Sequence, residues 1–176
     1  MRRFFYSVAF VTACVLPLQS VAAVSTIAPS TLATVNSRLN ALSWLTGKSF
    51  QCEDHVVYNN GKSRVDKYTQ SYSKPEGGWI TVRTDGTPIA FIGYDPNNSK
   101  YVAMGIDKPG SYTANYFHLS GNSIVYDLPY SFTNVTSASD TQTFTPSSNG
   151  YTGASGGASD RYPGATFKDT GTCTRK

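Results

Sequence analysis

The pattern closest to a catalytic motif lies at residues 153–157, where Gly-Ala-Ser-Gly-Gly matches the G-x-S-x-G signature of serine hydrolases. That motif needs a strand, a tight turn and a helix around the serine, and a histidine later in the chain as base. The surrounding stretch, residues 147–159, is instead rich in serine and glycine, and no histidine follows His118. We interpret this stretch as a flexible loop and expect no catalysis by Ser155.

Sequence patterns for a metal site or for acid–base catalysis are equally weak. Residues 95–99 imitate the start of a calcium loop, but Lys100 stands where that loop requires glycine. His55 and His118 are the only imidazoles, they are far apart in the sequence, and neither has an obvious carboxylate partner. We therefore predict no metal ion and no cofactor.

Tyrosine is the most promising residue type for binding, with 12 residues in the chain. In residues 100–107, Tyr101 and Ala103 share one face of a strand, and Met104 and Ile106 share the other. Small residues alternating with aromatic ones suit a cavity inside a barrel, where phenols can hydrogen-bond to a bound molecule. The alternative, that the tyrosines coat the outside, stays open because a shift of one residue in register inverts the faces. The candidate ligand-binding residues are Tyr68, Tyr72, Tyr101, Tyr112, Tyr116, His118 and Tyr126.

The elements that would position these residues are strands. The chain has 176 residues, a net charge of +4 and only 15% charged residues, and its basic residues form no cluster of the kind that nucleic-acid binding needs. Short alternating runs are separated by turn sequences such as Asn-Gly at residues 60–61. Strands are expected at residues 48–58, 63–73, 79–84, 88–94, 100–107, 111–119, 123–130, 140–146 and 164–174.

The N-terminus indicates export. Residues 1–23 have the charged start, the apolar run and the small-residue cleavage site of a secretory signal peptide, and the run is too short for a permanent membrane span. The predicted location is secreted or periplasmic. The alternative is a lipoprotein anchored through Cys14, because residues 11–14 resemble a bacterial lipoprotein processing box.

Residues 24–46 are expected to form an N-terminal segment with a capping helix, since Leu32, Val35, Leu39 and Leu42 recur at helical spacing and Gly47 is a suitable stop. Such a helix has one narrow apolar stripe and must pack against another element. We expect it to cover the β-domain, residues 47–176, and we consider a partner-binding helix the alternative.

Two cysteines remain after signal cleavage, Cys52 and Cys173, and an oxidising compartment favours a disulfide between them. A metal pair or a reactive thiol is a weaker interpretation, since neither has a ligand at metal spacing. Cys52 lies in the first expected strand and Cys173 in the last, so the bond would make these strands neighbours. Consecutive antiparallel strands whose ends meet in this way close into a barrel, which leaves no free edge.

Three segments resemble a known fold family. Residues 42–50 (Leu-Ser-Trp-Leu-Thr-Gly-Lys-Ser-Phe) resemble the opening of calycin-like barrels, and residues 93–101 with 107–111 resemble uncharacterised bacterial secreted proteins within that group. The closing residues 173–176 are similar to the end of their last strand. The resemblance implies an all-β, antiparallel, up-and-down, lipocalin-like barrel of about eight to ten strands with a short N-terminal helix. The haem-binding nitrobindins of this group use a histidine near the C-terminus, which this chain lacks, so haem is not expected.

The expected function is therefore non-covalent binding of a small apolar or aromatic molecule inside an exported barrel. An envelope or extracellular interaction module that contacts a protein partner through exposed tyrosines is the second hypothesis. A secreted enzyme that works through His118 with Asp107 or Asp127 is the third, and the absence of a clear catalytic motif weighs against it.

Overall fold

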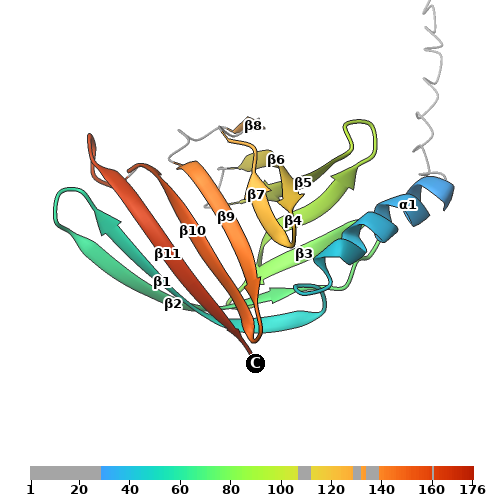
Figure 1. Cartoon of the computed structure of the whole chain (residues 1–176), viewed down its shortest axis with the longest axis horizontal. Coiled ribbons are helices and arrows are strands. Elements are labelled where there is room, and N and C mark those ends of the chain that lie inside the picture. Colours follow the sequence, from blue (N-terminus) through green and yellow to red (C-terminus); the bar gives the residue numbers. More distant parts are fainter. Residues whose placement is uncertain (1–28, 107–111, 129–131, 134–138, 160) are drawn as a thin grey trace, which may run out of the picture.

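The computed structural model describes residues 29–106, 112–128, 132–133, 139–159 and 161–176 (Figure 1). The predicted signal peptide and Cys14 lie outside these residues. The chain enters through helix α1 (Pro29–Leu39) and the 3-10 helix η1 (Asn40–Leu42). The strands are β1 (Lys48–Tyr58), β2 (Ser63–Tyr72), β3 (Trp79–Thr84), β4 (Thr87–Asp95), β5 (Lys100–Gly105), β6 (Thr113–Ser120), β7 (Ser123–Tyr126), β8 (Phe132–Thr133), β9 (Ser139–Ser147), β10 (Gly150–Ala158) and β11 (Thr166–Arg175). Within the described part of the chain, no helix has the length and apolar character that a membrane crossing requires.

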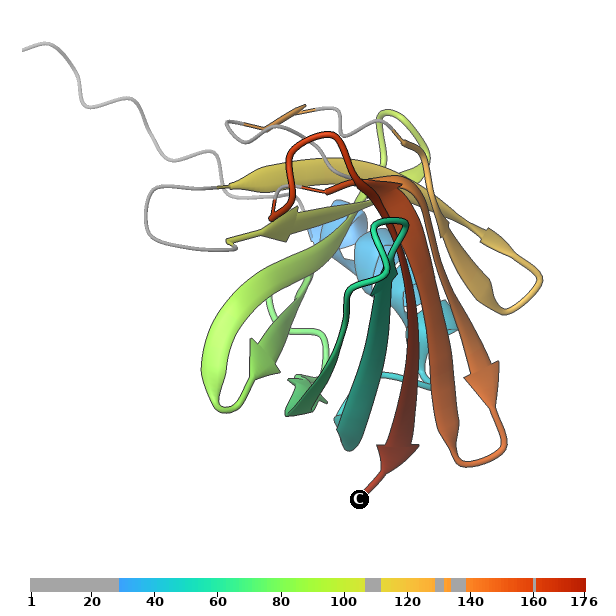
Figure 2. The ribbon, with the colours of Figure 1, turned by 90° about the vertical axis from the view of Figure 1, so that its left-hand side faces the viewer.

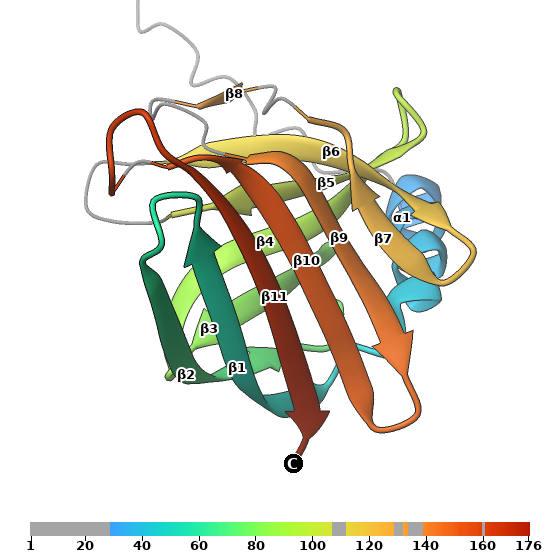
Figure 3. The same ribbon diagram turned by 60° about the vertical axis from the view of Figure 1, so that its left-hand side comes forward.

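Ten strands form a closed antiparallel barrel (Figures 2 and 3). Each strand pairs with the next along the chain, except that the short β8 lies outside the ring and pairs with β6. The ring is completed by β5 with β6, where Tyr101 lies opposite Phe117, and by β1 with β11. This confirms the predicted all-β antiparallel barrel, and the architecture is consistent with the calycin-like barrels.

The sequence prediction missed two strands, the two-residue β8 and, within the ring, β10. Residues 147–159, expected to be a flexible loop, contain β10, which pairs along its length with β9 and with β11. Glycine and serine have low intrinsic β-propensity, but two flanking strands supply a complete ladder of hydrogen bonds, and such context outweighs propensity. The small residues also fit their neighbours, because a Cβ atom at Gly153 would lie 3.2 Å from the Phe144 ring.

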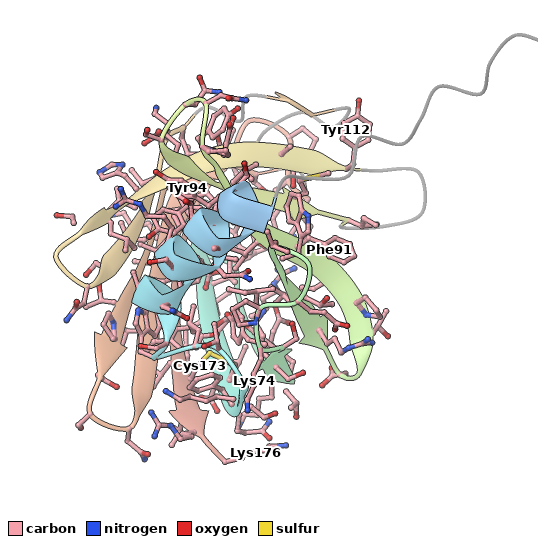
Figure 4. All side chains as sticks on the ribbon, turned by 90° about the vertical axis from the view of Figure 1, so that its right-hand side faces the viewer. Lys74, Phe91, Tyr94, Tyr112, Cys173 and Lys176 are labelled. Carbon is pink, nitrogen blue, oxygen red and sulfur yellow. A yellow bond between two sulfur atoms is a disulfide. The ribbon has the colours of Figure 1, made fainter. Side chains whose placement is uncertain are left out.

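The predicted N-terminal helix is present and lies across one end of the barrel (Figure 4). Its apolar stripe, Val35 and Leu39, continues into Leu42 and Leu45, and all four side chains belong to the core. The phenol of Tyr101 in β5 donates a hydrogen bond to the Arg38 carbonyl at 3.0 Å. Beyond the helix, Gly47 has φ +71°, a conformation that glycine adopts without strain, and directs the chain into β1.

The core is built around an aromatic cluster. Tyr151 is 2% exposed and has edge contacts with Trp44, Phe50, Tyr72 and Phe144 at centroid distances of 5.1 to 6.4 Å. Such contacts add about 0.5 to 1.5 kcal/mol each beyond burial of apolar area. These rings join the strands of the barrel to the segment that follows η1.

A disulfide joins Cys52 in β1 to Cys173 in β11, as the sequence predicts. The two residues are directly opposite in the antiparallel register, and both side chains are buried inside the barrel. The bond therefore covalently connects the first and last strands of the ring. The presence of a disulfide is compatible with an extracellular or periplasmic protein.

We expect the double variant Cys52→Ala/Cys173→Ala to lose about 2 to 4 kcal/mol of unfolding free energy, because the bond closes a long loop in the unfolded chain. Urea denaturation of the variant and the wild type, each with and without dithiothreitol, measures this loss. The reductant should shift the wild-type midpoint and leave the variant unchanged. An equal midpoint for reduced and oxidised wild type would contradict the assignment.

Candidate functional site

The barrel contains a cavity of about 290 Å³. Figure 2 looks along the barrel from the end opposite α1, which is seen at the far end. The cavity has two chemically different walls. The apolar wall comes from the segment after η1 and from β3, β4, β5, β7 and β9, and comprises Leu45, Val82, Ile89, Ala90, Ile92, Ala103, Ile124, Tyr126 and Phe144. The polar wall comes from β1, β2, β9, β10 and β11, and comprises Asp54, Tyr68, Gln70, Tyr72, Gln142, Tyr151, Ser155 and Asp169.

The phenols nearest the helix-covered end form a hydrogen-bonded group. The Tyr72 and Tyr151 hydroxyls are 3.0 Å apart, and both donate to Oε1 of Gln70. Burial raises the pKa of Tyr72 well above its usual value and that of Tyr151 to about 12. Both phenols are therefore neutral hydrogen-bond donors at physiological pH.

Two carboxyl groups lie on the same polar wall. Asp54 accepts a hydrogen bond from the Tyr68 hydroxyl at 2.8 Å, and Asp169 is hydrogen-bonded by Ser155, its direct neighbour in β10. Burial raises the pKa of both groups, and the negative charge of Asp54 contributes to raising that of Asp169 to about 6. The cavity therefore contains one carboxyl group, Asp169, with a pKa of about 6, and a second, Asp54, whose pKa burial raises above its usual value.

Glycines make room for these side chains. Gly171 lies opposite Asp54 in the β1–β11 register, and a Cβ atom there would be 2.2 Å from Asp54 Oδ1. Gly153 of β10 lies directly opposite Gly171, so two neighbouring strands carry no side chain at this level. The Asp54 carboxyl group occupies part of the resulting space.

The seven residues predicted to bind a ligand divide into two groups. Tyr68, Tyr72 and Tyr126 line the cavity. Tyr101 points inward but is covered by α1 and stacks on Phe117, with ring centroids 5.0 Å apart.

The remaining three residues lie outside the cavity lining, on the other face of β6 and just before it. Tyr112 is 51% exposed, Tyr116 donates to Asp95 at 3.0 Å, and His118 is exposed. The β5–β6 register explains the division, because Tyr101 faces Phe117 and not Tyr116. Tyr101 and Tyr116 therefore lie on opposite faces of the sheet.

Sequence analysis missed the carboxyl groups, although a signal for them exists. Side chains alternate along a strand, so Asp54 shares a face with Cys52, and Asp169 shares one with Cys173. Once the disulfide is placed inside the barrel, both aspartates must point inward as well. The same alternation from Tyr151 assigns Ser155 to the cavity.

The histidines form their contacts on the outer surface. His118 Nδ1 is 2.8 Å from Asp127 Oδ1, and His55 Nε2 is 2.8 Å from Glu53 Oε1. Neither histidine lines the cavity that contains Ser155, so the residues around that serine include no imidazole base. Among the residues that the structure describes, no group of three His, Cys, Asp or Glu side chains could hold a metal ion.

Comparison with models of known protein families found no match, and comparison with curated protein sequences found no match either.

We predict that Asp169→Asn makes the protein more stable above pH 6. The raised pKa means that the folded chain binds more protons than the unfolded chain between about pH 4 and pH 6. The free energy of unfolding of the wild type therefore falls as the pH rises through this window. Asparagine does not ionise, so the variant keeps the stability that the wild type loses. The gain should be about 1 to 2 kcal/mol at pH 7 and should shrink toward pH 4.

Urea midpoints of wild type and variant between pH 4 and pH 7.5 test this expectation. The control is Glu53→Gln, because hydrogen bonds from Lys67 and His55 lower the pKa of that exposed group. This control should be no more stable than wild type at any pH. A difference between Asp169→Asn and wild type that does not change with pH would refute the prediction.

Proposed function

We propose that this protein is an exported calycin-like barrel, related to the bacterial secreted proteins that its sequence resembles, and that it binds a small molecule in its cavity without covalent chemistry. The observation that carries the proposal is the cavity of about 290 Å³, with one apolar wall and one wall of hydrogen-bonding groups. Small-molecule sites have this composition, since apolar contacts supply affinity and a few polar groups set orientation.

The construction of the barrel supports this role. The cavity is surrounded by strands that are paired on both sides and by a disulfide, so its walls are held without a ligand. The ligand would be small and partly apolar or aromatic, with a polar group directed at β1, β2, β10 and β11. Such pre-organisation favours binding because little ordering is needed when the ligand enters.

Native mass spectrometry of the protein purified from an oxidising compartment tests the proposal. We expect a reproducible additional mass that organic extraction releases and identifies. A bare, disulfide-bonded chain that also fails to bind fatty acids, haem or aromatic metabolites would overturn the proposed function.

A matched pair of variants locates the binding. Ala103→Leu adds a larger side chain on the cavity side of β5 and should abolish the additional mass, whereas Ala114→Leu makes the same change on the outward face of β6 and should retain it. Ala90→Leu, at a second lining position, replaces Ala103→Leu if that variant does not fold. If the inner and outer variants both lose the additional mass, or both retain it, the ligand does not bind in the barrel cavity.

Binding of a protein partner is a second candidate, and one observation favours it. Phe91, Met104, Ile106 and Tyr112 are 39%, 46%, 52% and 51% exposed. Phe91 and Met104 are directly paired between β4 and β5, and Figure 4 shows Phe91 and Tyr112 on the same side of the barrel. Exposed apolar patches mark interaction sites in many proteins. If a protein partner is found, a Met104→Ser/Tyr112→Ser variant should bind it more weakly than wild type. Unchanged affinity of the variant for that partner would rule this candidate out.

A further inference from the structure

The charge of the cavity lining narrows the class of ligand, on the premise that the proposed function is correct. Asp54 and Asp169 both line the cavity, and the described residues of its lining include no lysine, arginine or histidine. Charged groups inside proteins are normally paired, because removing an unpaired charge from water is costly. Neither carboxyl group therefore has a basic partner among the described residues of the lining.

Arg64, the basic side chain that lowers the pKa of both aspartates, is engaged in another ion pair. Arg64 of β2 affects the pKa of both aspartates, but its Nε is 2.8 Å from Asp66 Oδ2 in an ion pair whose side chains are 43% and 47% exposed. Asp66 lies opposite Asp54 in the β1–β2 register and adds a third negative charge to this region. Arg64 is therefore shared among three carboxylates and neutralises at most one of them.

The internal hydrogen bonds leave part of this acceptor capacity unused. Asp54 receives the Tyr68 hydroxyl through Oδ2, and Asp169 receives the hydroxyl of Ser155. Oδ1 of Asp169 is buried and has no hydrogen-bond partner within the described residues. A buried acceptor without a donor is unfavourable, and a ligand with N–H groups would satisfy it.

The apolar wall suits the rest of such a ligand. Phe144 and Tyr126 lie beside each other there, with ring centroids 6.1 Å apart, and Ile124 contributes an aliphatic surface. An aromatic or aliphatic body can pack on these side chains, while aromatic faces also attract cations.

We propose that the cavity binds an organic cation, a protonated amine attached to a compact aromatic or aliphatic body, with Asp54 and Asp169 as its counter-charges. The ammonium group donates hydrogen bonds to the two carboxylates, and the body packs against the apolar wall. Fatty acids and other organic anions are excluded from this arrangement, because their carboxylate would face two like charges.

Three indole compounds of similar shape and different charge test the inference: tryptamine, tryptophol and indole-3-propionate, titrated into wild-type protein by calorimetry at pH 7.5. Tryptamine should bind at least about tenfold more tightly than tryptophol, as expected for charge-assisted hydrogen bonds. Indole-3-propionate should bind most weakly. This comparison uses only the wild-type chain and does not depend on the folding of any variant.

Variants then assign the effect to residues. Asp54→Asn and Asp169→Asn should each reduce tryptamine affinity about tenfold and leave tryptophol affinity within about twofold. Glu53→Gln is the matched control, since it removes the same charge from the next residue of β1 but on the outer face, where Glu53 contacts His55 and Lys67. Its affinity for tryptamine should equal that of wild type.

The possible outcomes separate the two proposals. Equal binding of the three compounds, or a preference for the anion, overturns the cation inference and leaves the ligand-binding barrel intact. A tryptamine preference that survives in both aspartate variants also overturns the inference. Absence of binding by all three compounds, together with absence of a co-purified molecule, overturns the proposed function itself.

Discussion

The pairing of β1 with β11 is the constraint on which the rest of the structure depends. Because side chains alternate along a strand, placing Cys52 and Cys173 opposite each other inside the barrel determines the direction of every other side chain in both strands. Asp54 and Asp169 then point into the cavity, and Glu53 and Thr170 point away from it. A shift of one residue in the β1–β11 register would separate the two cysteines and turn both carboxyl groups to the outer face. The disulfide therefore holds the register that keeps Asp54 and Asp169 in the polar wall.

The cavity combines features that oppose stability with features that restore it. Two carboxyl groups and several phenols face the interior of a small barrel, where unsatisfied polar groups are costly. The aromatic cluster around Tyr151, the core leucines Leu39, Leu42 and Leu45, and the disulfide stabilise the same barrel. Tyr72, Tyr151 and Cys173 belong both to this core and to the cavity lining, so the core holds part of the polar wall in place.

Much of the fold could be predicted from sequence because its signals are local. Turn sequences and alternation located most strands, leucine spacing located the helix, and cysteine count gave the disulfide. β10 was missed because its four glycines and its serine have no local preference for a strand, and only the ladders with β9 and β11 create one. The site was harder to predict. Whether Tyr101 or Met104 points inward depends on register, and Asp54 becomes a site residue only when Gly171 and Asp169 are brought beside it by strands more than a hundred residues apart in the chain.

Cys52 and Cys173 are separated by 121 residues in the sequence, so the pairing of β1 with β11 that closes the ring is a long-range step of folding. Neighbouring hairpins such as β1–β2 can form as soon as their residues are available, but the ring cannot close until the ten residues of β11 pair with β1. Long-range closure of this kind is slow, because the entropy of a large loop is lost before its contacts form. Until then β1 has an unpaired edge and the two cysteines are apart. The barrel and its cavity are therefore complete only once β11 has joined β1 and β10.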